Sequence, residues 1–392
     1  MKIDAVDFFP VATPAAQQVR DSTQETLLVR VRAGGYEGWG ECALAPLTAI
    51  ASLIGPPSHG GDRPFSAAVV GARLDQLDDI ARIAEEVRAR SPDPLAAAQA
   101  LSGIDIALWD LMGKRLEQPT CRLLGYPKAF PKLPYTSIDF GETGVETLSR
   151  AKSARQEGFR AVKFGGGLFG KIGPKEDQEH LVAAREGLGT DGMLLVDARS
   201  VWGDDLPRAV KSLRALRLTD VVWLQDPLAW ENLPAYASLS EQAGRISIAA
   251  GQECHHPRMA QHLMDYGRVK IIQIDAGRIG GISSAKQVAD MAVERNVTYL
   301  NHAAPSHLAL SAALQPYAGL ADHKLCAYPN HLGPVARALT VDHLRPEGEE
   351  GLIYLPDAPG HGMVPDLNTV RAHLVDVEIS LGGKMLYRTP AL

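Results

Sequence analysis

The sequence IIQIDAGRIGG (271–281), ISSAKQVADMAVERN (282–296) and VTYLNH (297–302) predicts a strand, a helix and a second strand. Asp275 ends the first strand and His302 ends the second. In a parallel βαβ unit both strands run the same way, so the two side chains reach the same edge of the sheet. A carboxylate beside an imidazole orients the ring and increases its basicity. By themselves the two residues fit an incidental structural pair better; the surrounding pattern makes them a candidate base.

The same alternation of short apolar segments and amphipathic helical segments extends from residue 134 to residue 328. The expected strands are PYTSID (134–139), RAVKF (160–164), LLVD (194–197), VVWLQ (221–225), ISIAAG (246–251), IIQID (271–275), TYLNH (298–302) and KLCAY (324–328). Their ends recur at roughly the spacing of a βα repeat. Eight strands in strict alternation predict a (β/α) barrel rather than a doubly wound sheet. The glycines at 165–167 lack the spacing of a dinucleotide-binding loop.

The residues before the barrel have the texture of an α+β domain. Residues 1–9, 26–33 and 36–42 alternate apolar and polar side chains, as antiparallel strands do. Helical periodicity then extends from residue 65 to residue 125. Two segments, 10–23 and 44–66, are expected to be long loops. Such loops serve as lids or binding segments as readily as plain surface loops.

We therefore expect three regions. A capping domain is predicted at 1–128 and a barrel at 129–340. The segment 341–392 is rich in turn-forming residues and is expected to fold back on the capping domain. The predicted fold class is a (β/α)7β modified TIM barrel with an α+β capping domain.

Composition narrows the function. The chain has 392 residues, of which 45% are hydrophobic and 22% charged, as in ordinary globular proteins. A dispersed net charge of -6 argues against binding nucleic acid or an anionic membrane. There is no signal-peptide core and no apolar run of about 18 residues, so a cytoplasmic location is expected. The 4 cysteines are widely spaced, which predicts free thiols.

Catalytic groups of such barrels come from the carboxyl ends of the strands. In chain order these ends carry Lys163, Asp197, Gln225 with Asp226, Gln252 with Glu253, Asp275, His302, and Ala327 with Tyr328. Acidic groups on successive strands suit a hard divalent cation such as Mg²⁺. A cation beside a lysine and a His–Asp pair would stabilise an enediolate while the base removes a proton α to a carboxylate.

Several motifs in this order resemble the enolase superfamily, in the branch that contains mandelate racemase and the acid-sugar dehydratases. They are GWGEC (38–42), IDIALWDLMGK (104–114), AVKF (161–164), LLVDARSVW (194–202), WLQDPL (223–228), AAGQE (249–253), IIQIDAGRIGG (271–281) followed by NH, and PDAPGHGM (356–363). The resemblance covers nearly the whole chain. It implies a capping domain over a (β/α)7β barrel, Mg²⁺, a small carboxylate substrate and a homo-oligomer.

The resemblance also assigns roles to individual residues. Asp197 matches the first metal ligand, and Asp275 with His302 matches the family's His–Asp pair. Lys163 matches the first lysine of the family's K-x-K element. Gly165 stands where the second lysine, usually the reactive base, would be.

The remaining metal positions depart from the family. Gln225 and Gln252 stand where carboxylate ligands are usual, and Ala327 stands where the last strand usually presents a glutamate. Neutral amides bind Mg²⁺ weakly, which puts the metal in doubt. A bulge could bring the neighbouring Asp226 and Glu253 inward as ligands.

Alternatively the metal is lost. Arg199, two residues after Asp197 in a segment taken as extended, would then pair with Asp197 or bind a substrate carboxylate. Tyr328 is a second candidate for substrate binding. Simple drift after loss of function would also explain the glutamines. His255, His256 and His307 lie near the same strand ends, where a structural role is the more common one.

The leading hypothesis is a lyase of this superfamily that dehydrates a small acid sugar or hydroxy acid. His302, oriented by Asp275, would act as base or acid, and Lys163 would lie near the substrate carboxylate. A racemase or epimerase is the first alternative, although it needs bases on both faces of the substrate carbon and Gly165 removes one. A metal-independent or non-catalytic ligand-binding protein is the second; the glutamines favour it and the His–Asp pair opposes it.

Overall fold

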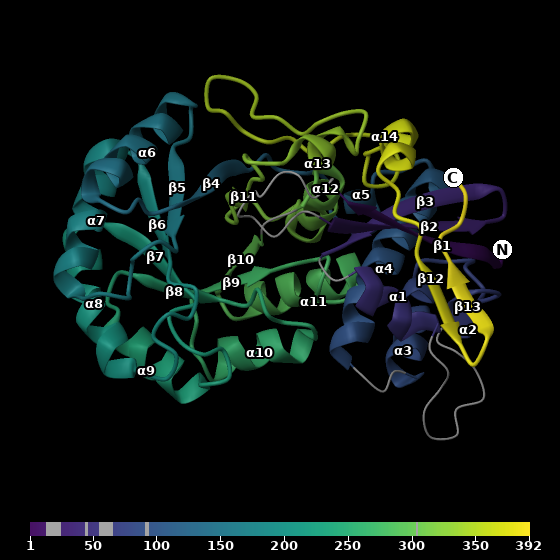
Figure 1. Ribbon diagram of the computed structural model, residues 1–392, viewed down its shortest axis with the longest axis horizontal. Coiled ribbons are helices and arrows are strands. Elements are labelled where there is room, and N and C mark those ends of the chain that lie inside the picture. Colours follow the sequence, from purple (N-terminus) through teal and green to yellow (C-terminus); the bar gives the residue numbers. More distant parts are fainter. Residues whose placement is uncertain (13–24, 44–45, 55–65, 91–93, 303–304) are drawn as a thin grey trace.

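The structure is a computed structural model that describes residues 1–12, 25–43, 46–54, 66–90, 94–302 and 305–392. Figure 1 shows a barrel of alternating strands and helices beside a smaller region in which an antiparallel sheet packs against helices. Both ends of the chain lie on the smaller region (Figure 1). The predicted fold class, a (β/α)7β barrel with an α+β capping domain, is confirmed.

The capping sheet consists of three antiparallel strands, β1 (Ile3–Ala12), β2 (Glu25–Ala33) and β3 (Tyr36–Cys42). Gly34 and Gly35 form the turn between β2 and β3 with φ of 57° and 84°, values that favour glycine. Helix α4 (Pro94–Leu116) packs directly on β3. A Cβ at Gly38 would lie 2.0 Å from the carbonyl oxygen of Ala107, so the close approach of helix and strand requires glycine there.

The other helices of this region are α1 (Pro46–Ile54), α2 (Ser66–Val69), α3 (Asp78–Arg90) and α5 (Thr120–Leu123). The prediction of one continuous loop at 44–66 is wrong, because α1 lies inside it. Helix α1 buries Ala49, Ile50 and Leu53, and this packing stabilises a helix that the surrounding Pro and Gly residues obscure in the sequence. Most of the rest of that loop, and nearly all of the predicted loop at 10–23, lie outside the described residues.

Eight parallel strands form the barrel sheet. They are β4 (Leu133–Asp139), β5 (Ala161–Gly165), β6 (Met193–Asp197), β7 (Val221–Gln225), β8 (Ser247–Ala250), β9 (Ile271–Ile274), β10 (Thr298–Asn301) and β11 (Leu325–Ala327). Their spatial order is β10-β9-β8-β7-β6-β5-β4-β11. Each predicted strand coincides with one of them. One buried side chain from each strand packs inside the barrel: Tyr135, Ala161, Leu195, Trp223, Ala249, Ile271, Leu300 and Ala327.

A side chain rather than a backbone ladder joins β10 to β11. The fully buried Asn301 donates from Nδ2 to the carbonyl oxygen of Ala327 (3.0 Å), and its Oδ1 accepts from the N–H of Ala327 (3.0 Å). The hydroxyl of Tyr317 also donates to Asn301 Oδ1 (2.8 Å). Asn301 therefore supplies, at this seam, the hydrogen bonds that a paired strand would make.

Replacing Asn301 by alanine is expected to lower the free energy of unfolding by about 3 kcal/mol, because it leaves buried polar groups without partners. Denaturant unfolding followed by circular dichroism measures the change. Asn368→Ala, at an exposed position of α14 (Leu367–Ala372), is the matched control and should change stability little. A loss for Asn301→Ala no larger than that of the control would contradict a structural role for the seam.

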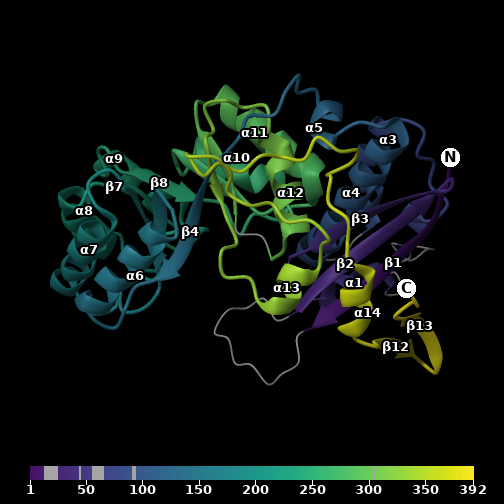
Figure 2. The same ribbon diagram turned by 90° about the horizontal axis from the view of Figure 1, so that it is seen from above.

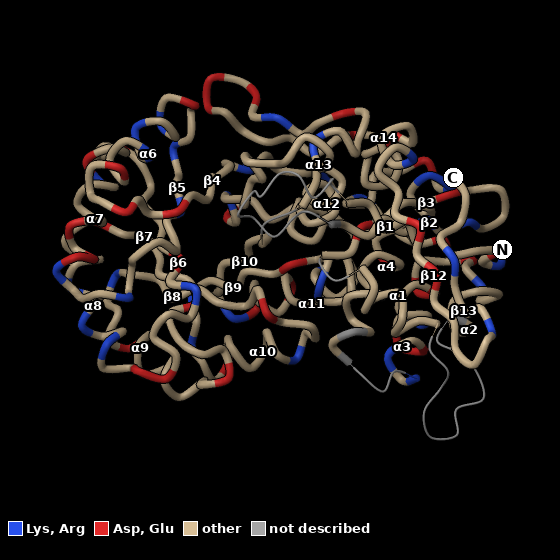
Figure 3. The backbone as a smooth tube through the Cα atoms, viewed as in Figure 1, with Lys and Arg blue, Asp and Glu red and all other residues tan. Residues whose placement is uncertain are grey.

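Helices cover the outside of the barrel between successive strands (Figure 1). They are α6 (Gly144–Gln156), α7 (Pro174–Leu188), α8 (Leu206–Leu218), α9 (Leu233–Gln242), α10 (Pro257–Asp265), α11 (Gly281–Glu294) and α12 (His307–Leu314), the last followed by the 3-10 turn η1 (Gln315–Tyr317). Several begin at a capping side chain that accepts from a main-chain N–H, for example Asp205 before α8 and Ser306 before α12. Acidic and basic residues are interspersed along these helices (Figure 3).

The C-terminal segment contains α13 (Pro334–Ala338), α14, and the hairpin β12 (Glu378–Leu381) and β13 (Lys384–Arg388). Figure 2 shows it running from the barrel back to the capping region. The N–H of Val375 donates to the carbonyl oxygen of Pro10 (2.9 Å), and the hydroxyl of Tyr387 donates to the carbonyl oxygen of Phe8 (2.7 Å). Within the described parts of the chain, no helix combines the length and apolar character needed to cross a membrane.

Candidate active site

A cavity of about 940 Å³ opens at the carboxyl ends of the barrel strands. Of the residues that the sequence places in the site, all except Gln225 line it: Lys163, Asp197, Arg199, Asp226, Gln252, Glu253, Asp275, His302 and Tyr328. The alignment follows from strand register, because Gly165 pairs with Asp197 and Asp197 pairs with Gln225 across neighbouring strands. Parallel strands in register present their terminal residues at one rim.

The His–Asp pair forms where β9 and β10 end. The N–H of His302 donates to the carbonyl oxygen of Ile274 (2.8 Å), which brings His302 beside Asp275. Nδ1 of His302 lies 3.4 Å from Oδ2 of Asp275. The other carboxylate oxygen accepts the N–H of Gly277 (2.8 Å), which fixes the carboxylate. With Nδ1 turned toward Asp275, Nε2 is the ring nitrogen left for proton transfer.

Lys163 lies on the neighbouring part of the rim with its side chain almost fully buried. Its Nζ donates to Oε1 of Gln225 at 2.7 Å and lies 3.3 Å from Oδ2 of Asp197. Of these two partners, Gln225 is neutral and Asp197 carries one negative charge. The ammonium is therefore not surrounded by negative charge and can still attract an anionic group in the cavity.

Asp226, directly after β7, is held in an unusual backbone conformation with φ of 41°. Its side chain is buried, and Oδ2 accepts from Nε2 of Gln225 at 2.9 Å. Burial, followed by repulsion from Asp197, raises the pKa of Asp226 to about 7. Asp226 thus reaches the cavity, as the proposed bulge would require.

Glu253, the other residue expected to turn inward, is engaged elsewhere. Its carboxylate pairs with Nη1 of Arg278 at 2.8 Å, and its side chain is 52% exposed. The same guanidinium nitrogen donates to the carbonyl oxygen of Gln252 (2.9 Å). Glu253 therefore sits at the solvent side of the rim rather than beside Asp197.

These residues do not fit the Mg²⁺ site that the resemblance implies. Near Asp197 lie the carboxyl group of Asp226 and the neutral amide of Gln225, which in turn contacts the amide of Gln252. The Lys163 ammonium lies against Asp197 and Gln225. Among the described residues, no group of three or more His, Cys, Asp or Glu side chains is arranged to hold a metal ion. Mg²⁺ needs several oxygen ligands in octahedral geometry and prefers carboxylates. The Lys163 ammonium instead binds the side chains of Asp197 and Gln225.

Metal titration tests this. Calorimetry with Mg²⁺ or Mn²⁺ at millimolar concentration is expected to show no saturable binding to the wild-type protein. The double variant Gln225→Glu/Gln252→Glu adds two carboxylates and is expected to bind the same ions measurably. Saturable binding by the wild type that disappears in Asp197→Ala would contradict this prediction.

The side chain of Arg199 does not pair with Asp197, as one hypothesis had it. Its guanidinium binds Asp139 at the end of β4 (2.6 Å), and only its backbone N–H donates to Asp197 Oδ1 (3.0 Å). Arg199 and Ser200 have φ of 50° and 53°, so the segment is a left-handed turn rather than extended. The turn sends the side chain across the cavity wall, where binding of a substrate carboxylate stays a prediction.

The other candidates contribute less. Tyr328 lines the cavity, but its hydroxyl donates to the carbonyl oxygen of Leu344 (3.1 Å). His256 caps α10, accepting from the N–H of Arg258 (3.1 Å), and His307 stacks on His343 with ring centroids 4.7 Å apart. Neither His256 nor His307 lines the cavity, so a structural role stays the prediction for both.

Sequence reasoning missed Asp139 and Arg278, which line the cavity and hold Arg199 and Glu253. Asp139 was detectable as the last residue of the first barrel strand. Arg278 lies in the IIQIDAGRIGG motif three residues after Asp275, a spacing that by itself does not indicate which way the side chain points.

A (β/α)7β barrel with a capping domain, and a cavity where a His–Asp pair and a lysine meet at the strand ends, define a barrel enzyme fold of the enolase type. Residues 146–369 match the family model for the enolase C-terminal domain-like family. Residues 6–125 match the N-terminal domain model of mandelate racemase and muconate lactonizing enzyme. The chain belongs to the enolase superfamily, in its mandelate racemase branch.

The chain is similar to solved structures and to enzymes of known name. The crystal structure of a predicted mandelate racemase from Rhodobacter sphaeroides is 50% identical with a TM-score of 0.96, and the match covers 100% of both chains. The D-galactarolactone cycloisomerase of Agrobacterium fabrum is 28% identical over 84% of this chain and 85% of its own length. The L-talarate/galactarate dehydratase of Salmonella typhimurium is 32% identical over 56% of this chain and 55% of its own.

Proposed function

We propose that this protein removes the proton α to the carboxylate of a small acid sugar or related hydroxy acid and then eliminates water. The observation that supports this is the placement of His302, oriented by Asp275, in one cavity with the buried ammonium of Lys163. A base and a fixed positive charge are the two elements that such a reaction needs. The similarity to a D-galactarolactone cycloisomerase and an L-talarate/galactarate dehydratase supports an acid sugar as the substrate class.

The chemistry can be written with these residues alone. Nε2 of His302 takes the α proton, and the electron pair moves into the substrate carboxylate to form an enediolate. Lys163 neutralises part of the new negative charge. The electron pair then expels the hydroxyl of the neighbouring carbon, His302 returns its proton to that hydroxyl, and water leaves. The resulting enol tautomerises to a 2-oxo acid.

The neutral side chains of Gln225 and Gln252 are consistent with a role for Lys163 as the positive charge that stabilises the enediolate. A glutamate at position 225 would add a second carboxylate, at 2.7 Å, to the Asp197 carboxylate that already pairs with Lys163, whereas the amide oxygen of Gln225 orients the ammonium without adding negative charge. The desolvated ammonium then retains its attraction for a substrate carboxylate, which is stronger in a buried site than in water.

A racemase is the weaker candidate because it needs a second base on the opposite face of the substrate carbon. Gly165 carries no side chain, and a Cβ there would lie 2.9 Å from the carbonyl oxygen of Asp197 and 3.4 Å from Nε of Arg199. The space that a lysine would use is therefore partly filled. A single base favours elimination over racemisation.

The test separates proton removal from the later loss of water. Wild-type protein is incubated in D₂O with a panel of aldonic and aldaric acids. Exchange of the α proton is followed by NMR, and formation of a 2-oxo acid is followed by a colorimetric carbonyl assay. We expect exchange together with loss of water for at least one acid. Exchange without 2-oxo acid, accompanied by a change of configuration, would replace the dehydratase by an epimerase. Binding without exchange would leave a ligand-binding protein.

A further inference from the structure

Glu41, in the GWGEC motif, has no part in the proposed reaction. It lies near the end of β3 in the capping sheet and is 1% exposed. The end of this strand is tied to the turn that holds the His–Asp pair, because the N–H of Ala43 donates to the carbonyl oxygen of Gly277 (3.0 Å). A buried carboxyl group of the capping domain is thereby placed behind the His302–Asp275 pair of the barrel.

Two hydroxyls hold the Glu41 carboxyl group. Thr26 donates to Oε1 at 2.5 Å, and Ser306, at the start of α12, donates to Oε2. Among the described residues, Glu41 forms no ion pair with a lysine, arginine or histidine. Burial raises the pKa of Glu41 to about 7, and the charge of Asp275 adds to the effect. Its ionisation therefore falls in the neutral range.

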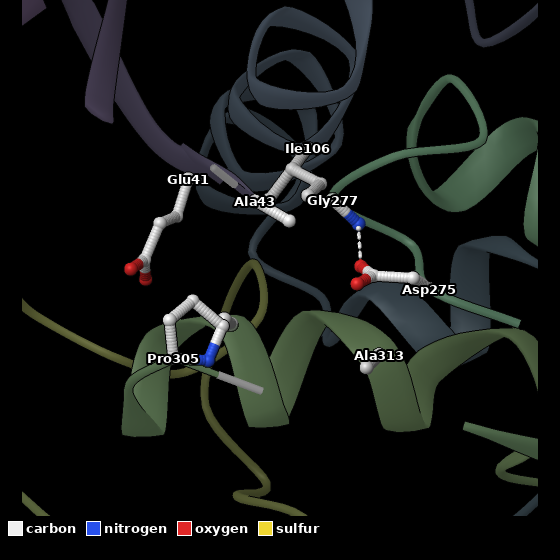
Figure 4. A pocket seen from close by; sticks show the side chains of 8 residues that line it. Glu41, Ala43, Ile106, Asp275, Gly277, Pro305 and Ala313 are labelled. Atoms are coloured by element: carbon white, nitrogen blue, oxygen red, sulfur yellow. Dashed lines mark hydrogen bonds between the residues drawn. The ribbon is translucent and has the colours of Figure 1, made fainter. Parts of the chain in front are cut away.

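A small cavity separates Glu41 from Asp275. Its volume is about 10 Å³, close to what one water molecule requires. Figure 4 shows the two carboxyl groups on opposite sides of it, and the apolar part of the wall includes Ala43, Ile106, Pro305 and Ala313. Cavities that stay dry are apolar, whereas this one has a carboxyl group on each of two sides.

We propose that one buried water in this cavity bridges Glu41 to Asp275, and that Glu41 is a positioning residue that tunes the basicity of His302 from the capping domain. The consequence for catalysis rests on the proposed function. A negative charge on Glu41 reaches the imidazole through the water and Asp275 and favours the protonated ring. Of the other titratable groups beside Glu41, Cys42 stays a neutral thiol because burial raises its pKa to about 12.

The first test follows the ring resonances of His302 by NMR as a function of pH, with His302→Asn used to assign them. We expect the ionisation of Glu41 to broaden this curve in the wild type. In Glu41→Gln the curve is expected to narrow to a single proton and its midpoint to move about half a pH unit lower, a roughly threefold loss of proton affinity. Asp105→Asn, another buried carboxyl of the capping domain, is the control and should leave the curve unchanged.

A second variant keeps the test valid if Glu41→Gln does not fold. Thr26→Val preserves shape and removes one hydroxyl from the carboxylate, which favours protonated Glu41 and should move the His302 curve the same way by less. A crystal structure of the wild type should also show one water within hydrogen-bond distance of both carboxyl groups. An unchanged His302 curve in both variants, or a dry cavity, would overturn the proposal. These readouts need no turnover, so they stand apart from the test of the reaction.

Thermal unfolding reports the ionisation of Glu41 independently. The folded-state pKa of about 7 lies above the ordinary value of 4.5. The stability contributed by this carboxyl group is therefore fully present below pH 4.5 and is lost as the pH rises through 7. The Tm of the wild type is expected to fall relative to that of Glu41→Gln between about pH 4.5 and pH 7, the interval that the two pKa values span. A difference in Tm that does not change with pH would show that Glu41 does not titrate in this range.

Discussion

Replacing His302 by asparagine is expected to lower α-proton exchange by about a thousandfold, because the variant keeps a polar side chain but has no group that accepts a proton near neutral pH. The expectation rests on the position of the ring, with Nδ1 at 3.4 Å from Asp275 and the ring lining the cavity. Exchange measured by NMR in D₂O gives the rate directly for whichever acid is active.

Two variants make the result specific. Asp275→Asn should also reduce the rate, by less, since it leaves the base in place and removes the group that orients it. His262→Asn, on the exposed face of α10, removes a histidine far from the cavity and should have no effect. Exchange by His302→Asn at the wild-type rate would contradict the assignment of the base and direct attention to Lys163.

Replacing Lys163 by methionine is expected to reduce kcat/KM by about 10²–10³-fold, because it removes the fixed positive charge that faces the developing enediolate. If the ammonium acts mainly on the transition state, the loss will appear in kcat; if it also binds the substrate carboxylate, KM will rise as well. Methionine fills a similar volume, and the protein fold is checked by circular dichroism.

Lys171→Met is the control for this variant. Lys171 is exposed, and its ammonium donates to the carbonyl oxygen of Gly167 (2.7 Å) outside the reacting groups. The control should retain full activity. Lys163→Met with unchanged kcat/KM would mean that another cation stabilises the enediolate, and Mg²⁺ binding would then be retested in that variant, where the competing ammonium is gone.

The combination of Gln225, Gln252 and Lys163 supports the prediction that this chain does not use the Mg²⁺ that its superfamily generally uses. A divalent ion and a buried ammonium both offer positive charge to an enediolate, but they need opposite surroundings. The ion needs several carboxylates, whereas an ammonium with several carboxylates would lose its effect. Glutamine at positions 225 and 252 gives the site the surroundings that suit an ammonium better than a divalent ion.

The sequence alone determined the fold and identified candidate residues that line the cavity, although it missed Asp139 and Arg278. The βα period from residue 134 onward sets the barrel, because a parallel strand must be followed by a crossover helix. The same rule places Asp275 and His302 at one rim, since both end neighbouring parallel strands. Helix α1 was missed because its short apolar segment lies among Pro and Gly residues and is stabilised by tertiary burial rather than by local propensity.

Only the tertiary structure decided where side chains point and which charges they meet. Arg199 turns toward Asp139 through a left-handed backbone that its residue type does not predict. Lys163 meets Gln225 from a position 62 residues away. Glu41 reaches the back of Asp275 only because the capping sheet packs on the barrel, and its burial there, which no local pattern encodes, moves its ionisation to neutral pH. Hydrophobic periodicity specifies which face of an element is buried, whereas contacts between distant segments depend on the packing of the whole chain.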